Sequence, residues 1–275
     1  MFCLRPPRPL KGWGVEIKMA GAVLKNNKHC LLLCFFSIFA AIMTNHVMKK
    51  GILTLLLFVA IAISAHSQGK TSVANFGEWF STYVGYLTPD TMETWYFNRH
   101  DDPKRTDVFS VRQTWWWQVI QRMNWKLEVN NSYSGSTICN TGYNDADYTH
   151  RSFITRHKSL GHPDVILLFG GTNDSWSGAP IGEFKYADWK RADLYTFRPA
   201  LAYLLEHMQD RYPTARIYFM LNSDLKEVVN TSVAEICKHY NVPVIRLHDI
   251  DKSSGHPNQK GMKQIADQVV EALKN

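Results

Sequence analysis

The sequence predicts an α/β fold in which a five-stranded parallel sheet lies between two layers of helices. Short apolar runs with strand character alternate with longer segments of helical periodicity. The run Val165–Phe169 is apolar at every position, as expected for a strand buried on both faces of a sheet. Strands that alternate with helices form right-handed crossovers, which place helices on both faces of a parallel sheet.

Five segments are expected to form strands, and their number suits a flavodoxin-like three-layer α/β/α sandwich. The strands are expected over 71–76, 126–131, 165–169, 216–221 and 242–247. Helices are expected over 114–123, 151–160, 194–212, 225–240 and 261–273. The stretches 81–112 and 175–193 are expected to be irregular. No repeat or linker interrupts this pattern, so residues 68–275 are interpreted as one domain.

Two of the helices carry clear local signals. Thr114 belongs to the residue types that cap helices, and it precedes three consecutive tryptophans, Trp115–Trp117. These three cannot all face one core, because adjacent helical positions diverge by about 100°, so core packing is expected for two of them. The helix over 194–212 has apolar residues at helical spacing and stops before Pro213.

The N-terminal part has the features of a secretory signal. Met48–Lys50 is basic, Ile52–Ile63 is an apolar run of secretory length, and Ser64–Ser67 has a small-x-small cleavage pattern before Gln68. The apolar run is shorter than the ~20 residues that a spanning helix needs. We therefore expect a secreted or periplasmic protein without a stable membrane anchor after cleavage. Residues 1–47 are interpreted as an N-terminus that begins too early; a two-segment membrane anchor is the alternative.

The charge of the chain lies in this leader. The first 67 residues hold eight of the 31 Lys and Arg residues and one of the 24 acidic residues, so 23 of each remain. The domain is formally neutral, and the basic pI gives no argument for a nucleic-acid partner. Only Cys139 and Cys237 follow the expected cleavage site. Pairing and two buried thiols both remain open, since their separation in space cannot be read from sequence.

Polar clusters follow four of the expected strands. Gly77–Trp79 comes after the first, Ser134 and Gly135 after the second, Gly171–Asp174 after the third and His256 after the fifth. The carboxyl ends of parallel strands meet at one edge of a sheet, and ligands bind at that edge in open α/β folds. The sequence therefore predicts one shared site.

These clusters resemble the SGNH, or GDSL-type, hydrolases. Gly171–Asp174 matches the Gly-x-Asn-Asp block of that family, and Gly135 matches its oxyanion glycine. His256 stands in His-Pro-Asn, with Gly261 five residues later, and matches the catalytic-histidine block. Ser81–Tyr86 resembles the continuation of the first block. The tryptophan pair at 115–116 and the segment 130–136 resemble a secreted bacterial branch.

The resemblance implies ester hydrolysis by acyl transfer, on an acyl or acetyl group that a carbohydrate can carry. In that chemistry a serine attacks the ester carbonyl, a histidine takes its proton, and N–H donors stabilise the oxyanion. The donors implied here are the side-chain amide of Asn173 and the N–H groups of Gly135 and residue 79. The expected ligand is a small-molecule or carbohydrate ester, with no cofactor and no metal.

The chain departs from the family at two positions. Gly77-Glu78-Trp79 stands where the family has Gly-Asp-Ser, and an indole cannot be a nucleophile. The family's acid lies three residues before the histidine, and that position is Ser253. Asp251, Asp249 or a backbone carbonyl is expected to orient His256 instead.

Several alternatives follow from these departures. Ser81 or Ser134 could replace the nucleophile, although turn or capping roles are more usual for such hydroxyls, and Glu78 with His256 could activate water. Two functions fit the sequence. One is an exported ester hydrolase with a non-standard nucleophile, and the other is a catalytically silent relative that binds a glycan or acylated ligand. A serine at position 79 is expected to give esterase activity, and Glu78→Asp to raise it further. Aromatic side chains near the expected site suit stacking on sugar rings, although core packing accounts for part of this set: Trp79, Trp95, Tyr96, Trp176 and Trp189.

Overall fold

The structure is a computed structural model that describes residues 69–97 and 105–274. The expected over-extended N-terminus (1–47) and the signal peptide (48–67) lie outside the described residues and remain predictions. In the described part, no helix is both long and apolar enough to cross a membrane. Cys139 and Cys237 are both buried and free, so the alternative of two unpaired thiols holds in this structure.

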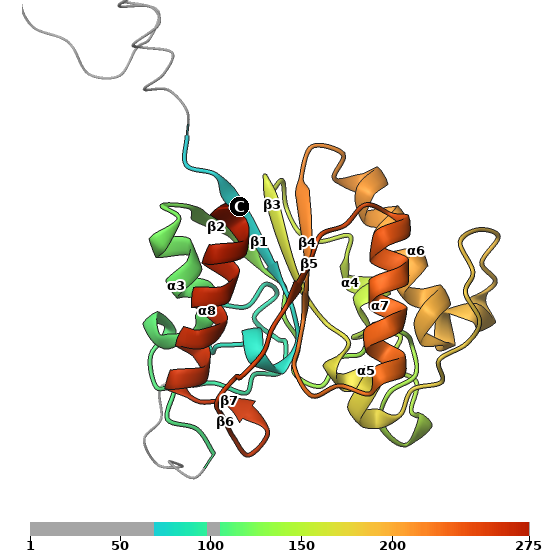
Figure 1. Cartoon of the computed structure of the whole chain (residues 1–275), viewed down its shortest axis with the longest axis horizontal. Coiled ribbons are helices and arrows are strands. Elements are labelled where there is room, and N and C mark those ends of the chain that lie inside the picture. The colour runs from blue at the N-terminus through green and yellow to red at the C-terminus, as the bar shows by residue number, and fades with distance from the viewer. Residues whose placement is uncertain (1–68, 98–104, 275) are drawn as a thin grey trace, which may run out of the picture. The chain divides into compact units, whose positions relative to one another are not determined.

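The described residues form a parallel five-stranded sheet with helices on both faces, which confirms the predicted fold (Figure 1). The strand order is β2-β1-β3-β4-β5, the flavodoxin-like order. The strands are β1 Ser72–Phe76, β2 Lys126–Asn130, β3 Val165–Phe169, β4 Arg216–Leu221 and β5 Val244–Arg246. Every residue of β1 and β3 is buried. The chain changes direction of winding between these two strands, which opens a crevice at their carboxyl ends.

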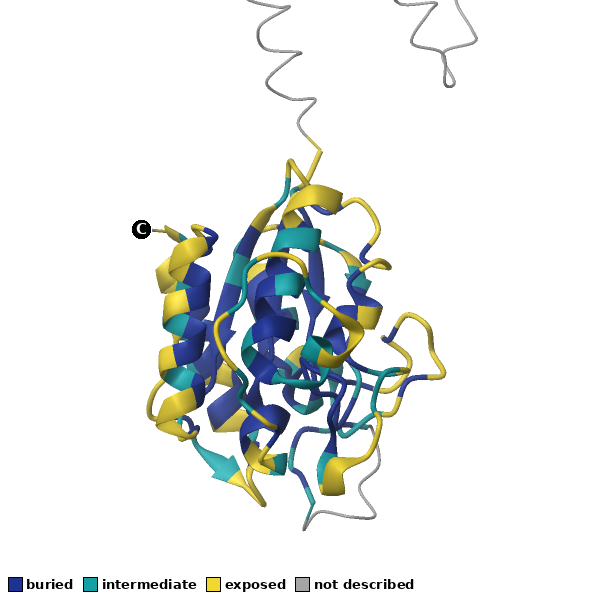
Figure 2. Cartoon of the chain, turned by 90° about the vertical axis from the view of Figure 1, so that its right-hand side faces the viewer, coloured by how far each residue is buried: buried dark blue, intermediate teal, exposed yellow. Residues whose placement is uncertain are grey.

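Two apolar clusters fill the space on either side of the sheet. On one side, alternate residues of β1 and β3 pack against α3 Trp115–Arg122 and α8 Gln259–Lys274. On the other side, the intervening residues pack against α4 Phe153–Arg156, α6 Phe197–Arg211 and α7 Glu227–His239. This division follows from the alternation of side chains along a strand. The outward sides of the helices are exposed and the sheet is buried (Figure 2).

The tryptophans of α3 behave as their spacing predicts. Trp115 and Trp116 are fully buried, whereas Trp117 is only partly buried. Thr114 is the N-cap residue of α3, but its hydroxyl donates to the carbonyl of Val111 rather than capping the helix amides. The helix therefore begins where the sequence predicts, for a different local reason.

The helix expected over 151–160 is much shorter in the structure. α4 ends after Arg156, because a tertiary partner replaces the next helical turn. The hydroxyl of Tyr212 donates to the carbonyl of His157 and accepts from the amide of Leu160. A side chain 55 residues away in sequence thus ends this helix, which local periodicity cannot indicate.

A small hairpin completes the site-bearing edge. β6 Lys252–Ser253 and β7 His256–Pro257 pair antiparallel after β5 and lead directly into α8. The hairpin places His256 beside η1 Trp79–Ser81, the short turn that follows β1.

Candidate active site at the carboxyl edge of the sheet

The turn after β1 brings the first polar cluster to the edge of the sheet. A Cβ on Gly77 would lie 2.5 Å from Oγ of Ser81 and 3.0 Å from Oγ of Ser132, so only glycine fits here. The chain then turns through η1, which buries Glu78 completely and leaves Trp79 partly exposed.

The turn after β3 differs from its prediction. Instead of an irregular loop, α5 Thr172–Ser177 begins directly after Gly171, which has a φ of +92°. The first amides of a helix have no partner within the helix. Here the amides of Thr172 and Asn173 donate to the carboxyl group of Glu78, at 3.1 and 3.3 Å.

The side chain of Asn173 is bonded on both sides. Its Nδ2 donates to Oε2 of Glu78 and to the carbonyl of Ser136, at 2.9 Å for the latter. Its Oδ1 accepts from Nε1 of Trp79, at 2.5 Å, and from the hydroxyl of Tyr143, at 2.8 Å. An indole N–H can only donate, so the atom that it meets must be the oxygen. Both amide hydrogens of Asn173 are therefore used inside the protein and do not face a ligand.

Two buried carboxyl groups lie under the site. Burial raises the pKa of Glu78 to about 8, and the neighbouring Asp174 adds to the effect, although bonds from Thr172 and Asn173 oppose it. Burial also raises the pKa of Asp174 to about 6, against the amides of Ile138 and Cys139, at 2.8 and 3.2 Å. Glu78 is therefore mostly neutral at pH 7.

Arg156 is a site residue that sequence reasoning missed. Its buried guanidinium donates to the carbonyl of Gly77 at 3.2 Å, to Oγ of Ser136 at 3.0 Å, and to the carbonyl and Oδ1 of Asn131 at 2.6 and 2.7 Å. It joins the turn after β1 to the loop that carries Gly135. Tyr143 was missed as well, and nothing in its neighbouring sequence marks either residue.

The indole of Trp79 lies over the loop after β2. Gly135 has a φ of +75°, and a Cβ there would lie 3.3 Å from a ring carbon of Trp79. The same indole lies beside His256, with ring centroids 5.3 Å apart. Trp79 thus touches Gly135, Asn173 and His256, and the structure brings these four predicted residues together.

His256 stands in an aromatic enclosure. Its ring stacks on Trp95 at 3.6 Å between centroids and 10° between planes, and Phe80 and Trp176 meet it edge-on at 5.6 and 5.9 Å. Its Nδ1 lies 2.8 Å from the carbonyl of Ser254, and its Nε2 is buried without a hydrogen-bond partner. Burial, and then the nearby cations of Arg105 and Lys252, lower the pKa of His256 to about 4, against the Ser254 contact.

Comparison with known proteins assigns the family. The model of the GDSL-like lipase/acylhydrolase family matches residues 71–273. The chain belongs to this family. No curated protein sequence matches it.

Two solved structures from Bacteroides resemble this GDSL-like protein over nearly their whole length. A protein assigned as a GDSL-like lipase from Bacteroides ovatus ATCC 8483 is 56% identical, with a TM-score of 0.73, over 75% of this chain and 99% of the other. A protein assigned in the same way from Bacteroides uniformis ATCC 8492 is 51% identical, with a TM-score of 0.74, over 76% and 98%. A carbohydrate esterase shares the fold at 18% identity and a TM-score of 0.52, over 77% and 70%.

The acid of the GDSL-like site is not Asp251. Its carboxylate pairs with Nζ of Lys260 at 2.8 Å and accepts from Nδ2 of Asn258 at 2.9 Å, so it anchors the start of α8. The other candidate, Asp249, contacts His248 and is exposed. The carbonyl of Ser254 orients His256, which is the third of the expected alternatives.

The alternative nucleophiles do not reach His256. Oγ of Ser81 is buried beneath Gly77 without a partner, and Oγ of Ser134 lies 3.4 Å from Oγ1 of Thr82. The carboxyl group of Glu78 faces the amides at the start of α5, and no contact among the described residues joins it to His256. The geometry therefore supports neither a replacement serine nor water activation by Glu78.

Several aromatic side chains lie elsewhere than predicted. Trp189 packs on Tyr203 and His207, away from the site. Tyr96 lies beside the site as predicted, but it is fully buried and its hydroxyl donates to the carbonyl of Pro257, so it has no face for a ligand. Trp95 is at the site, but His256 covers one of its faces. The guanidinium carbon of Arg105 lies 4.2 Å from the centroid of the same ring. Since two groups this close cannot share a face, Trp95 has no face left for a sugar.

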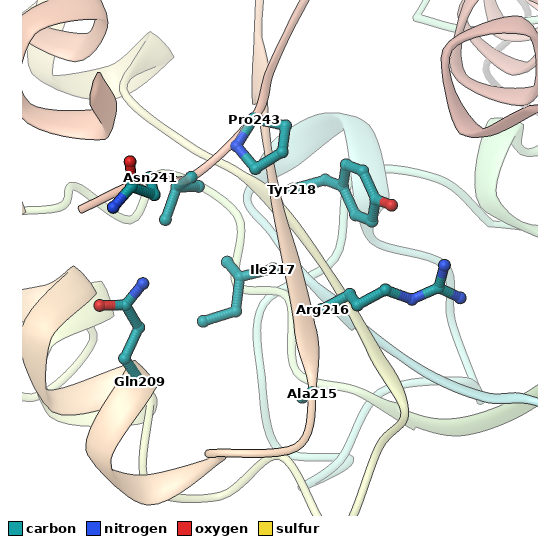
Figure 3. Close-up of a pocket in the computed structure, with 8 residues that line it drawn as sticks. Gln209, Ala215, Arg216, Ile217, Tyr218, Asn241 and Pro243 are labelled. Carbon is teal, nitrogen blue, oxygen red and sulfur yellow. The ribbon is translucent and has the colours of Figure 1, made fainter. Parts of the chain in front are cut away.

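Trp176 is the predicted ligand-binding aromatic that stays accessible, with 40% of its surface exposed. The part of the chain that the structure describes contains no group of three or more potential metal ligands. A groove of about 280 Å³ lies at the amino ends of β4 and β5, the edge of the sheet opposite the site (Figure 3). Ile217 points into this groove, which contains none of the predicted site residues.

Proposed function

We propose that this GDSL-like protein binds a carbohydrate or an acylated carbohydrate at the carboxyl edge of its sheet and does not hydrolyse esters by the serine mechanism. The observation that carries the proposal is the position of Trp79. Its indole stands where the family has the serine, donates to Asn173 and lies over Gly135.

Two parts of the serine mechanism are missing from this geometry. The nucleophile is replaced by an indole, and the amide hydrogens of Asn173 are bound by Glu78 and Ser136. Removal of one oxyanion donor typically costs a hydrolase about 10²–10³ in turnover. With the nucleophile absent, attack on an ester by the serine mechanism is not supported, and with Asn173 engaged the oxyanion loses one of its three expected donors.

Three features support a carbohydrate ligand. Trp176 presents an exposed indole, and sugar rings stack on such apolar faces. The unpartnered Nε2 of His256 can accept a hydrogen bond from a hydroxyl group. The distant carbohydrate esterase with this fold is described as having both catalytic and non-catalytic binding functions at its active site.

One observation favours a second function, ester hydrolysis by water. His256 is a neutral imidazole with a free Nε2, and such a group can take a proton from water. The carboxyl group of Glu78 faces the amides at the start of α5, so no second group among the described residues positions that water, and we place this function second.

A paired assay tests the proposal. We expect no hydrolysis of 4-nitrophenyl acetate or acetylated xylo-oligosaccharides above that of His256→Ala. Calorimetry with xylo-oligosaccharides should show binding that Trp176→Ala weakens at least about tenfold, or about 1.4 kcal/mol, because the exposed indole supplies the apolar contact. Trp189→Ala serves as the matched control and should bind as the unaltered protein does.

Two results would overturn the proposal. Turnover that survives Ser81→Ala and Ser134→Ala but is lost in His256→Ala would establish the water mechanism and overturn the proposal. Absence of carbohydrate binding, together with absence of turnover, would overturn it as well.

We also infer that the protein is exported and begins near Gln68 after cleavage. The basic segment and apolar run before that residue support the inference. N-terminal sequencing or intact mass of the exported protein tests it, and retention of residues 1–47 would contradict it.

A further inference from the structure

We infer that the ligand of this site is an acidic carbohydrate, which carries a carboxylate beside its hydroxyl groups. The inference rests on the proposed function and adds the charge of the ligand to it. The hydrogen-bond partners and the charges around His256 support it.

His256 has one hydrogen-bonded and one unpaired ring nitrogen. The carbonyl of Ser254 can only accept, so Nδ1, at 2.8 Å, carries the proton. Nε2 is then an acceptor, and it has no partner although His256 is only 7% exposed. Leaving a buried polar atom without a partner costs free energy. A hydroxyl group of a ligand would remove that cost.

The second step concerns Arg105. Its guanidinium covers the face of Trp95 opposite His256, its Nε is buried without a partner, and no ion pair joins it to an acidic residue in the described part of the chain. The indole N–H of Trp95 is a second buried donor without a partner. The aromatic enclosure thus presents one cation and one further N–H donor that nothing in the described residues satisfies.

The third step adds Lys252 on the other side of the hairpin. Its Nζ donates to Oγ of Ser223 at 3.1 Å and pairs with Asp224 at 3.2 Å, but the Asp224 side chain is 83% exposed. An exposed partner of this kind neutralises little, because water screens it. The charges acting on His256 are those of Arg105 and Lys252, both positive.

The carboxyl groups beneath the site do not balance these cations. Glu78 is mostly neutral at pH 7. Asp174 is ionised, but it faces the amides of Ile138 and Cys139, and its charge is not among those that act on His256. The site therefore combines a positive field with a single free acceptor. A carboxylate satisfies the field and the donors, and a hydroxyl satisfies Nε2 of His256, so one ligand needs both groups.

Access to Nε2 requires a side chain of the enclosure to move. Trp176 is 40% exposed, and Trp79 can turn out at the cost of one hydrogen bond. Its indole is partly exposed, and its N–H bond to Oδ1 of Asn173 is the hydrogen bond that is lost when it turns out. Oδ1 then keeps the bond from Tyr143 at 2.8 Å. The net contribution of one neutral hydrogen bond is modest, and ligand contacts can replace it.

Calorimetry with tetragalacturonic acid and its fully methyl-esterified form tests the inference, because the two differ in charge and share the sugar skeleton. We expect the acid to bind at least tenfold more tightly at pH 7, and the difference to shrink in high salt. Arg105→Gln and Lys252→Gln should each remove most of the difference, whereas Arg105→Lys should retain it. The controls are Arg122→Gln on α3 and Lys263→Gln on α8. Each removes an exposed cation that pairs with Asp267, and neither should change the difference in affinity between the two tetramers.

The outcomes separate this inference from the proposed function. Equal binding of the two tetramers, with loss in Trp176→Ala, would overturn the acidic ligand and leave carbohydrate binding intact. Binding of butyrate as tightly as of the acidic tetramer would show that a carboxylate alone suffices and would also overturn it. If neither tetramer nor a neutral xylo-oligosaccharide binds, the proposed function itself fails.

Discussion

The two halves of the site use their polar atoms in opposite ways. In the polar half, around Glu78, Asn173 and Arg156, the hydrogen-bonding groups of Asn173 and Arg156 meet partners within the protein. In the aromatic half, around His256 and Trp95, Nε2 of the imidazole and Nε1 of the indole have none. A native protein leaves few buried polar atoms unpaired, and those it leaves need an explanation.

The contrast indicates which half is free to recognise a ligand. A donor that already has a protein partner must break one bond to make another, so it contributes little to binding. The polar half, which supplies the oxyanion donors in the serine mechanism, therefore stabilises the fold here. The aromatic half has unpaired donors and acceptors that the proposed ligand would satisfy.

The largest expected effect is on stability, and it comes from the polar half. Arg156→Met removes a buried cation that joins Gly77, Asn131 and Ser136, and leaves the oxygens of Asn131 and Ser136 without this donor. We expect the free energy of unfolding in urea to fall by about 3–5 kcal/mol, because each buried polar atom left unpaired costs about 1–3 kcal/mol. Arg112→Met, at an exposed position, is the control and should change it by less than about 0.5 kcal/mol. A small effect at Arg156 would mean that the polar half is not structural.

The next effect is on esterase activity, and it tests whether the polar half can again supply an oxyanion donor. Trp79→Ser alone should recover little esterase activity, because Asn173 remains bound to Glu78 and Ser136. Glu78→Asp withdraws the carboxyl group by one methylene and releases Nδ2 of Asn173. We therefore expect the double variant to exceed the single one by about 10² in turnover of 4-nitrophenyl acetate. Addition of His256→Ala should abolish the gain, and equal activity in the single and double variants would contradict this account.

A pH effect tests the buried carboxyl group. The pKa of Glu78 is raised to about 8 from an ordinary value of 4.5, so its contribution is full below pH 4.5 and is lost as the pH rises towards 8. Between pH 6.5 and 8 we expect the contribution of Glu78 to the free energy of unfolding to fall by about 1.5 kcal/mol. Glu78→Gln should remove this slope, whatever its absolute stability.

Other groups contribute in the opposite direction in this window, so the contribution of Glu78 is the difference between the unaltered protein and Glu78→Gln. The pKa values of His256 and His157 are lowered to about 4 from 6.5, so each adds about 0.4 kcal/mol of stability as the pH rises from 6.5 to 8. The pKa of Asp174, raised to about 6, is also exceeded throughout the window. A slope in Glu78→Gln equal to that of the unaltered protein would assign the effect to another group.

The smallest expected effect is on stability, and it tests whether Trp79 can hold the side chain of Asn173 without Tyr143. Tyr143→Phe removes one of the two bonds to Oδ1 of Asn173, and the bond from Trp79 remains. We expect a loss of about 1 kcal/mol in urea unfolding. Tyr148→Phe, in the same loop, should have less effect. A loss of several kcal/mol at Tyr143 would show that Trp79 does not hold Asn173 by itself.

The sheet was predictable because its signals are local. The apolar run Val165–Phe169 and the residues that follow each strand placed the site at the carboxyl edge between β1 and β3. The helix at 151–160 was predicted too long, because Tyr212 ends it from elsewhere in the chain. The start of α5 at Thr172 was missed because Asn-Asp after a strand is also common in turns.

The sequence by itself determined the fold class, the edge of the sheet at which the site lies, and the replacement of the nucleophile by Trp79. Tertiary structure alone decided how each polar atom is used. The side chain of Asn173 takes its partners from Glu78, Trp79, Ser136 and Tyr143, up to 95 residues away along the chain. Which of these donates and which accepts depends on the meeting of distant segments within about 3 Å. A strand pattern repeats every two residues and carries no information about such meetings.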